Sequence, residues 1–145
     1  MEIEIKRLSE TARLPERGSS LAAGYDLFAD LSSEVELAPH TTAMIGTGIA
    51  LAIPEGYFGG VFARSGLSAK EGLRPANCTG VVDADYRGEV KVALHNDGND
   101  ARKISPGQKI AQMVILPFLP VSFTEVEQLD QTARGEGGFG STGKM

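Results

Sequence analysis

Cysteine and histidine are scarce in this chain of 145 residues, and their scarcity excludes several kinds of protein. Cys78 is the single cysteine, so the chain can form neither an internal disulfide framework nor a cysteine-cluster metal site. The two histidines, His40 and His95, are too few and too far apart to predict a metal site, and they do not indicate a Ser-His-Asp triad. A lone cysteine fits a reducing compartment, and we expect the cytoplasm.

Long apolar runs and an excess of basic charge are also missing. The longest apolar stretch, Ala43 to Ile53, is interrupted by Gly46, Thr47 and Gly48 and falls short of the roughly 20 residues that cross a bilayer. No basic and then apolar leader opens the chain. The net charge of −5 argues against general nucleic-acid binding, which depends on many Lys and Arg residues that neutralise phosphates. We expect no membrane and no nucleic-acid partner, whereas a small polyanion needs only a few well-placed cations.

Glycine and proline, by contrast, are frequent, with 18 and 7 residues, and they separate short runs of β-branched residues. These runs predict strands over residues 3–6, 42–53, 57–63, 81–83, 89–94 and 109–116. In the run from Glu89, the alternation of Val90, Val92 and Leu94 is typical of a half-buried strand. A short helix is predicted from Ser65 to Gly72. Many short strands with turns between them predict an all-β sandwich, jelly roll or barrel rather than a doubly wound α/β fold.

The segment 134–145 has a composition of its own, since five of its twelve residues are glycine. Gly138, Gly140 and Gly143 satisfy the pattern G-x-G-x-x-G, and residues 138–145 satisfy G-x-x-x-x-G-K-[ST] except at the last position, Met145. Both patterns bind phosphate through backbone N–H groups between a strand and a helix, and neither element is predicted here. We therefore expect a domain over residues 1–133 and a flexible arm, 134–145, that closes over a site built elsewhere.

The densest group of functional side chains lies in residues 80–90, which predict a β-hairpin. Its turn, Asp83 to Gly88, carries Asp83, Asp85, Tyr86 and Arg87. A carboxylate beside a bound polyphosphate can orient or deprotonate a water, and such general-base help is typically worth roughly 10² to 10⁴ in rate. An Asp-rich turn that only satisfies its own backbone is the competing interpretation.

Two shorter segments also allow two interpretations each. In Arg64-Ser-Gly-Leu67, Ser65 either caps the predicted helix or helps its N–H groups to receive a phosphate. Asp26 follows a run of small residues and is either a turn residue or a contact of a metal region.

Taken in order, five segments resemble the five motifs of the trimeric dUTP diphosphatase (dUTPase) family. They are Ala23-Gly-Tyr-Asp-Leu27, Arg64-Ser-Gly-Leu67, Gly80-Val-Val-Asp-Ala-Asp-Tyr-Arg-Gly-Glu-Val90, Gly107-Gln-Lys-Ile-Ala-Gln-Met113 and Arg134-Gly-Glu-Gly-Gly-Phe-Gly-Ser-Thr-Gly143. Each motif alone is weak, but all five in order over nearly the whole chain are specific. One departure is Ala63 before the second motif, where many members have proline, and it affects loop stiffness more than chemistry.

The resemblance implies a jelly-roll-like β-barrel or sandwich with a flexible C-terminal arm, assembled as a homotrimer with sites at subunit interfaces. It implies dUTP as substrate, hydrolysed to dUMP and pyrophosphate, with Mg²⁺ on the triphosphate. This activity would limit uracil incorporation into DNA and supply dUMP for thymidylate synthesis. By the same similarity, Asp83 activates the water that attacks the α-phosphorus, and Tyr86 packs on the deoxyribose.

The other roles that the resemblance implies fall into four groups. The phosphates would be held by Arg64, Ser65, Gly66 and Gln112. Asn77 would contact the nucleoside, and Asp26 would reach the metal through water. The arm would supply Phe139 to stack on uracil, and its residues that close over the distal phosphates would be Arg134, Gly140, Ser141 and Thr142.

Base selectivity is expected from the predicted hairpin rather than from the arm. A hydrophobic pocket gains only about 1 to 3 kcal/mol from a methyl-sized difference such as that between thymine and uracil, so steric exclusion by a rigid backbone is needed. Phe139 can stack on any base, because every base has a π-face.

Two other functions stay open at this point. One is a nucleotide-sensing module in which the site controls a partner protein, although the presence of Asp83 argues against a non-catalytic relative. The other is dCTP deamination by a relative of the same fold, which the uracil-type segment and the aromatic arm disfavour.

Overall fold

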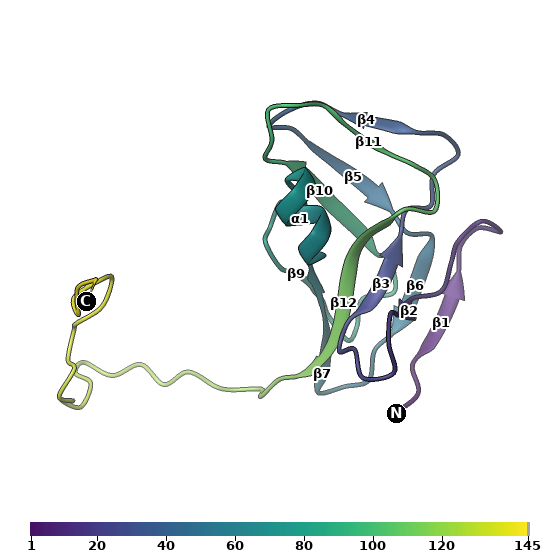
Figure 1. Cartoon of the computed structure of the whole chain (residues 1–145). Helices are drawn as coiled ribbons and strands as arrows, with labels where there is room; N and C mark the ends of the chain where they lie inside the picture. The colour runs from purple at the N-terminus through teal and green to yellow at the C-terminus, as the bar shows by residue number, and fades with distance from the viewer. Residues whose placement is uncertain (145) are drawn as a thin grey trace.

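Short strands dominate this computed structural model, which describes residues 1–144 (Figure 1). The strands are β1 (Glu4–Arg7), β2 (Glu16–Arg17), β3 (Tyr25–Phe28), β4 (Val35–Leu37), β5 (Thr42–Gly46), β6 (Ile49–Ala52), β7 (Tyr57–Phe62), β8 (Leu73–Pro75), β9 (Gly80–Val82), β10 (Lys91–Asn96), β11 (Arg102–Ile104) and β12 (Lys109–Pro117). The only helix in this part of the chain is α1 (Ser65–Glu71). The predicted all-β class is confirmed.

The strands form four antiparallel sheets that do not close into a barrel within the described residues. The largest has the order β2-β3-β12-β7-β9, and the next has the order β5-β10-β8; β1 pairs with β6, and β4 pairs with β11. β12 is the longest strand and lies in the middle of the five-stranded sheet. It therefore fixes the positions of the strands on both of its sides.

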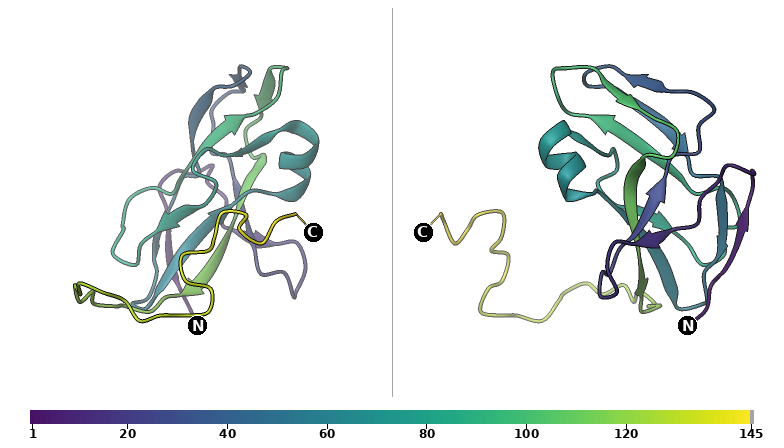
Figure 2. Two further views of the ribbon diagram at one scale, coloured as in Figure 1. Left: turned by 90° about the vertical axis from the view of Figure 1, so that its left-hand side faces the viewer. Right: turned by 45° about the vertical axis from the view of Figure 1, so that its right-hand side comes forward.

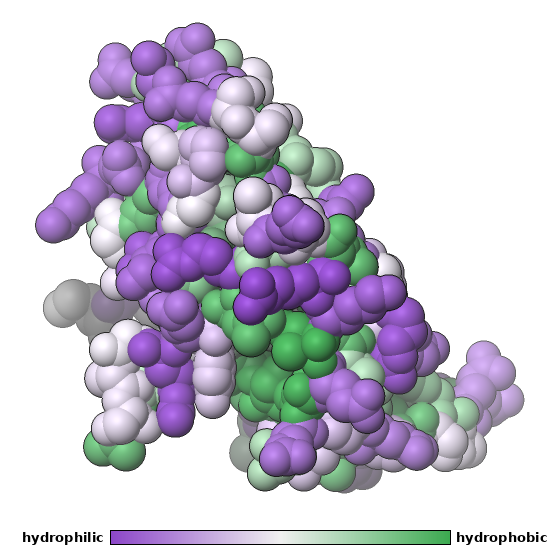
Figure 3. Space-filling model, turned by 90° about the vertical axis from the view of Figure 1, so that its right-hand side faces the viewer, coloured by the Kyte–Doolittle hydropathy of each residue, from purple (hydrophilic) through white to green (hydrophobic). Residues whose placement is uncertain are grey.

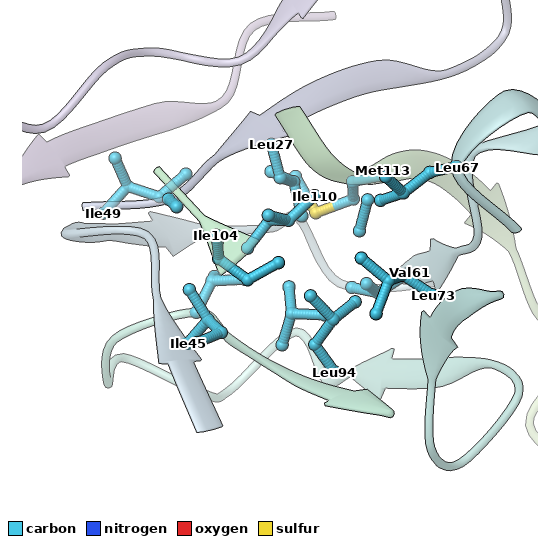
Figure 4. Packing of buried hydrophobic residues seen from close by; sticks show 14 of the residues in the cluster. Leu27, Ile45, Ile49, Val61, Leu67, Leu73, Leu94, Ile104, Ile110 and Met113 are labelled. Carbon is cyan, nitrogen blue, oxygen red and sulfur yellow. The ribbon is translucent and has the colours of Figure 1, made fainter. Parts of the chain in front are cut away.

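The hydrophobic core lies between these sheets. Its buried side chains come from most of the strands and from α1, and Figure 4 shows them pointing toward one another: Leu27, Ile45, Ile49, Val61, Leu67, Leu73, Leu94, Ile104, Ile110 and Met113. The alternation predicted for β10 is confirmed, because Val90, Val92 and Leu94 are buried. A continuous core of this kind holds loops at its edge in fixed positions.

One buried polar side chain ties the loop after β10 to this core. Asn96 donates from Nδ2 to the carbonyl oxygens of Leu37 (3.0 Å) and Asp100 (2.9 Å), and its Oδ1 accepts from the Gly98 N–H (2.9 Å). The side chain is fully buried, so these bonds replace the water that it loses.

The single strand predicted over residues 42–53 is instead two strands in different sheets. β5 ends at Gly46, and β6 begins at Ile49. Gly48 lies between them at φ +68°, and a Cβ there would overlap the Asp30 carboxylate and the Ala12 methyl group. Glycine is the residue that permits this turn.

The hairpin predicted over residues 80–90 is also corrected. β9 pairs with β7, whereas β10 pairs with β5 and β8. The segment between β9 and β10 therefore connects two sheets. Alternation of side chains identifies a strand but does not name its partner, which is why the sequence suggested a local pairing.

The chain from Phe118 to Lys144 forms no strand or helix. Figure 1 and the right-hand view of Figure 2 show it leaving the end of β12 and running away from the folded domain. Several large apolar side chains along it are exposed, among them Leu119, Val121, Phe123 and Leu129. Within residues 1–144, no helix is long and apolar enough to span a membrane.

Candidate functional site

The pairing of β12 with β3 and β7 brings the first group of predicted site residues together. Gln112 lies opposite Asp26 of β3 on one side and opposite Phe62 of β7 on the other. Arg64 follows two residues after Phe62 and precedes the first residue of α1. Three segments that are far apart in the sequence thus meet at one row of the sheet.

Asp26 forms ion pairs with two cations that lie close to this row. Its Oδ1 accepts from Arg64 Nε at 3.0 Å, and its Oδ2 lies 3.2 Å from Lys109 Nζ. The Asp26 side chain is only 13% exposed, so both cations compensate a largely desolvated carboxylate. Lys109 lies within the fourth motif, but the sequence assigned it no role. Its contact with Asp26 becomes visible only from the register between β3 and β12.

Gln112 holds the backbone that leads into Arg64. Its Nε2 donates to the Ala63 carbonyl oxygen at 2.9 Å. Gly24 faces the same amide, because a Cβ on Gly24 would overlap Gln112 Oε1. The glycine of the first motif therefore leaves room for the glutamine of the fourth.

Ser65 and Gly66 lie at the start of α1 and are both exposed. The interpretation of Ser65 as a helix cap is wrong, because Arg64 is the N-cap residue and no side chain caps the helix. The first N–H groups of a helix have no partner within it, so this end of α1 faces solvent with donors available.

The second group of predicted residues lines a separate cleft. Asn77, Asp83 and Tyr86 lie on its wall together with residues of β9 and β10. Asp83 is exposed, and Tyr86 is 45% exposed. A carboxylate, an amide and an aromatic ring thus share one concave surface.

The loop from Asp83 to Glu89 is held by its own hydrogen bonds. The Tyr86 hydroxyl donates to the Glu89 carbonyl at 2.8 Å, the Tyr86 N–H donates to the Asp83 carbonyl at 3.1 Å, and Arg87 Nη1 donates to the Ala84 carbonyl at 2.6 Å. A Cβ on Gly88 would meet the Tyr86 ring and hydroxyl within 3 Å. These contacts fix the ring and the direction in which the loop presents Asp83.

The third group lies in the glycine-rich tail. Arg134 Nε donates to the Gly137 carbonyl at 2.7 Å, and the Ser141 N–H donates to the Gly138 carbonyl at 3.1 Å, so this stretch forms local turns. Phe139 has a φ of +51°, and its side chain is fully exposed. Gly140, Ser141 and Thr142 are exposed beside it.

The structure thus sorts the predicted residues into three groups and does not unite them within one chain. The described lining of the Asp83 cleft contains neither Arg64 nor Gln112, and no residue of the tail. The tail extends away from the domain in Figure 1. Within residues 1–144, no three His, Cys, Asp or Glu side chains are arranged to hold a metal ion.

These features define an all-β protein with a carboxylate-bearing cleft, an arginine beside an uncapped helix start, and a glycine-rich tail. The sequence model of the dUTPase family matches residues 10–143. The chain therefore belongs to the dUTPase family.

Curated relatives that match nearly the whole of this chain agree with this membership. A deoxyuridine 5′-triphosphate nucleotidohydrolase of Syntrophotalea carbinolica is 48% identical over 141 residues, which are 97% of this chain and 96% of that protein. A protein of the same name from Oryza sativa subsp. japonica is also 48% identical and matches 97% of this chain and 80% of its own length.

Solved structures show the same fold. A mutant dUTPase of Staphylococcus bacteriophage 80alpha, determined with dUpNHpp, has a TM-score of 0.89, is 34% identical and covers 98% of both chains. A mutant dUTPase from phage phi11 of S. aureus has a TM-score of 0.81, is 31% identical and covers 90% of this chain and 100% of its own. That protein coordinates a structural Mg(II) ion.

Gly24→Ala tests the contact between the first and fourth motifs. The added methyl group is expected to displace the Gln112 amide from the Ala63 carbonyl and so to loosen Arg64. Loss of one such bond typically costs about 1 kcal/mol, or roughly a fivefold change in affinity for a nucleotide triphosphate. Titration calorimetry with dUpNHpp measures it.

Gly18→Ala is the matched control, because a Cβ on Gly18 meets no atom within 4 Å. It should bind as the wild type does. Equal affinity for the Gly24→Ala protein and the wild type would contradict a role for this contact.

Proposed function

We propose that this chain hydrolyses dUTP to dUMP and pyrophosphate. The observation that carries the proposal is the shared placement of Asp83, Tyr86 and Asn77 on one cleft in a chain of the dUTPase family. The names of the relatives, deoxyuridine 5′-triphosphate nucleotidohydrolase, support the same reaction.

Asp83 is the proposed general base. It accepts a proton from a water, whose oxygen forms a bond to the α-phosphorus, while the bond from that phosphorus to the bridging oxygen breaks and pyrophosphate leaves. Its exposure and its place on the cleft wall give water access to the carboxylate. The bonds that hold the loop fix the backbone that carries Asp83, and general-base catalysis requires a positioned side chain.

Tyr86 and Asn77 are proposed to bind the nucleoside. The Tyr86 hydroxyl is bonded to the Glu89 carbonyl, so the ring has a fixed orientation and can pack on a deoxyribose while a 2′-hydroxyl would collide with it. Backbone groups of β9 and its loop would pair with the uracil edge. A cytosine would leave such buried groups without partners, which costs roughly 1 to 3 kcal/mol for each.

Arg64, Ser65, Gly66 and Gln112 are proposed to hold the phosphates. The exposed N–H groups at the start of α1 and the Arg64 guanidinium offer hydrogen-bond donors and positive charge to an anion. Gln112 contributes by holding the Ala63 backbone in place.

Mg²⁺ is the proposed cofactor, bound mainly to the triphosphate. Mg²⁺ commonly keeps several waters and takes one or two carboxylates together with substrate phosphates. Asp26 offers carboxylate oxygens, which Mg²⁺ prefers, but both of them already pair with Arg64 and Lys109. Asp26 would therefore reach the ion through water. The bound ion would neutralise phosphate charge.

A homotrimer with sites at subunit interfaces is the proposed assembly. The separation of the Asp83 cleft from the Arg64 group supports a site completed by another copy. An apolar groove lined by Ile3, Ile5, Leu51, Met113 and Ile115 offers surface that association would cover. Figure 3 shows hydrophobic residues gathered in the lower half of the face that carries β1 and β6.

The segment 134–145 is proposed to be the arm that closes over a site, with residues 1–133 as the domain; Met145 lies outside the described residues. Phe139 would stack on uracil, while Arg134, Gly140, Ser141 and Thr142 would contact the distal phosphates. The exposure of all five residues supports this role, since no packing holds them to the domain. The cytoplasm is the proposed location, in agreement with the free Cys78.

The Asp83→Asn variant is expected to keep nucleotide affinity and to lose catalysis by about 10² to 10⁴, because asparagine cannot accept the proton. Pyrophosphate release from dUTP measures the rate, and calorimetry with dUpNHpp measures binding. Asp85→Asn, a change in the same loop, is the control and should retain more activity. Wild-type turnover by the Asp83→Asn protein would refute the assigned base.

Deletion of residues 134–145 is expected to leave the domain folded and to impair catalysis. The loss of a stacked aromatic ring alone is worth about 1 to 3 kcal/mol, or roughly 5- to 150-fold in affinity. Circular dichroism should show an unchanged β spectrum and melting temperature. Full kcat/KM in the shortened protein would rule out an arm that closes over the site.

A further inference from the structure

A β-bulge in β12 places the Lys109 side chain on the opposite face of the sheet from the one that a regular strand would give it. Gln112 pairs with Asp26 and Ala111 pairs with Leu27, so Phe28 should pair with Ile110; instead it pairs with Lys109. Directly opposed residues of an antiparallel pair point to the same face, and a shift by one residue reverses the face. The bulge therefore moves Lys109 to the face that Phe28 shares with Asp26, while Ile110 enters the core.

As a result, Lys109 forms an ion pair with one of the two carboxylate oxygens of Asp26. Its Nζ lies 3.2 Å from Oδ2, whereas Arg64 uses Oδ1 and bonds it through Nε alone among the described contacts. Arginine and carboxylate groups frequently pair through two parallel bonds when both oxygens are free. Asp26 thus divides its two oxygens between two cations, with Lys109 at Oδ2 and the Nε of Arg64 at Oδ1.

We propose that Lys109 is a positioning residue that acts through Asp26 on Arg64. By pairing with Oδ2, the ammonium group competes with Arg64 for the charge of the Asp26 carboxylate, and so leaves the Arg64 guanidinium more available to a bound phosphate. The inference rests on the proposed function in one respect, namely that Arg64 binds the phosphates of the nucleotide.

The Lys109→Met variant tests the inference, because methionine keeps much of the length and removes the charge. We expect the Kd for dUpNHpp and the KM for dUTP to rise about tenfold, as for the loss of one well-placed charge-assisted hydrogen bond, with a smaller change in kcat. Lys109→Arg should restore values close to the wild type. Lys103→Met is the control, since Lys103 is an exposed residue of β11 that pairs with Glu34.

The Asp26→Asn background separates positioning from direct contact. If Lys109 acts through Asp26, adding Lys109→Met to Asp26→Asn should change the Kd no further. The same tenfold loss in both backgrounds would mean that Lys109 attracts the phosphates directly, and the inference would be overturned. An unchanged Kd and KM in the single Lys109→Met variant would overturn it as well.

The proposed function and this inference fail in different ways. Wild-type protein that releases no pyrophosphate from dUTP would refute the proposed function. Active wild-type protein with a fully active Lys109→Met variant would refute only the role of Lys109. The melting temperatures of the Lys109 variants are expected within a few degrees of the wild type, because the Lys109 side chain is 44% exposed, and melting curves of every variant check that each one folds.

Discussion

The antiparallel pairing of β12 with β3 and β7 is the constraint on which the rest of the site depends. This register places Asp26, Gln112 and Phe62 in one row, and the turn after β7 then delivers Arg64 to the Asp26 carboxylate. A slip of one residue would reverse every side chain of β12, burying Gln112 and exposing Met113. The core enforces the register, because Ala111 and Met113 pack inside it. Stability and the proposed phosphate binding therefore rest on the same hydrogen-bonded ladder.

The site residues divide between rigid and exposed segments in a way that suits their chemistry. Asp83 and Tyr86 lie on a loop fixed by its own hydrogen bonds, which suits their proposed roles in selecting a base and orienting a water. Phe139 lies on a tail without strand or helix, which suits a proposed lid that opens for substrate and product. The lining of the Asp83 cleft does not include Arg64. In the proposed trimer, copies would complete one another's sites, and assembly and activity would then be linked.

The sequence predicted the class of fold, the helix, and the alternation of β10, because these follow from local periodicity and turn residues. It also predicted which residues to place at the site, through ordered motifs. The sequence did not predict which strands pair with one another. Residues 80–90 connect two sheets rather than forming a hairpin, and residues 42–53 divide into two strands at Gly48. The contact of Lys109 with Asp26 was not predicted for the same reason. The residues Lys-Ile-Ala-Gln carry no local signal for a bulge, and the bulge brings Lys109 to Asp26 only when β3 is paired with β12.

The most direct test is pyrophosphate release from dUTP, dTTP, dCTP and UTP, assayed side by side with and without Mg²⁺. In the proposed mechanism, a rigid loop between β9 and β10 excludes a 5-methyl group and a 2′-hydroxyl while Asp83 activates the attacking water. Turnover of dUTP is therefore expected far above that of the other three nucleotides, and faster with Mg²⁺. Comparable release from dTTP or UTP would contradict it.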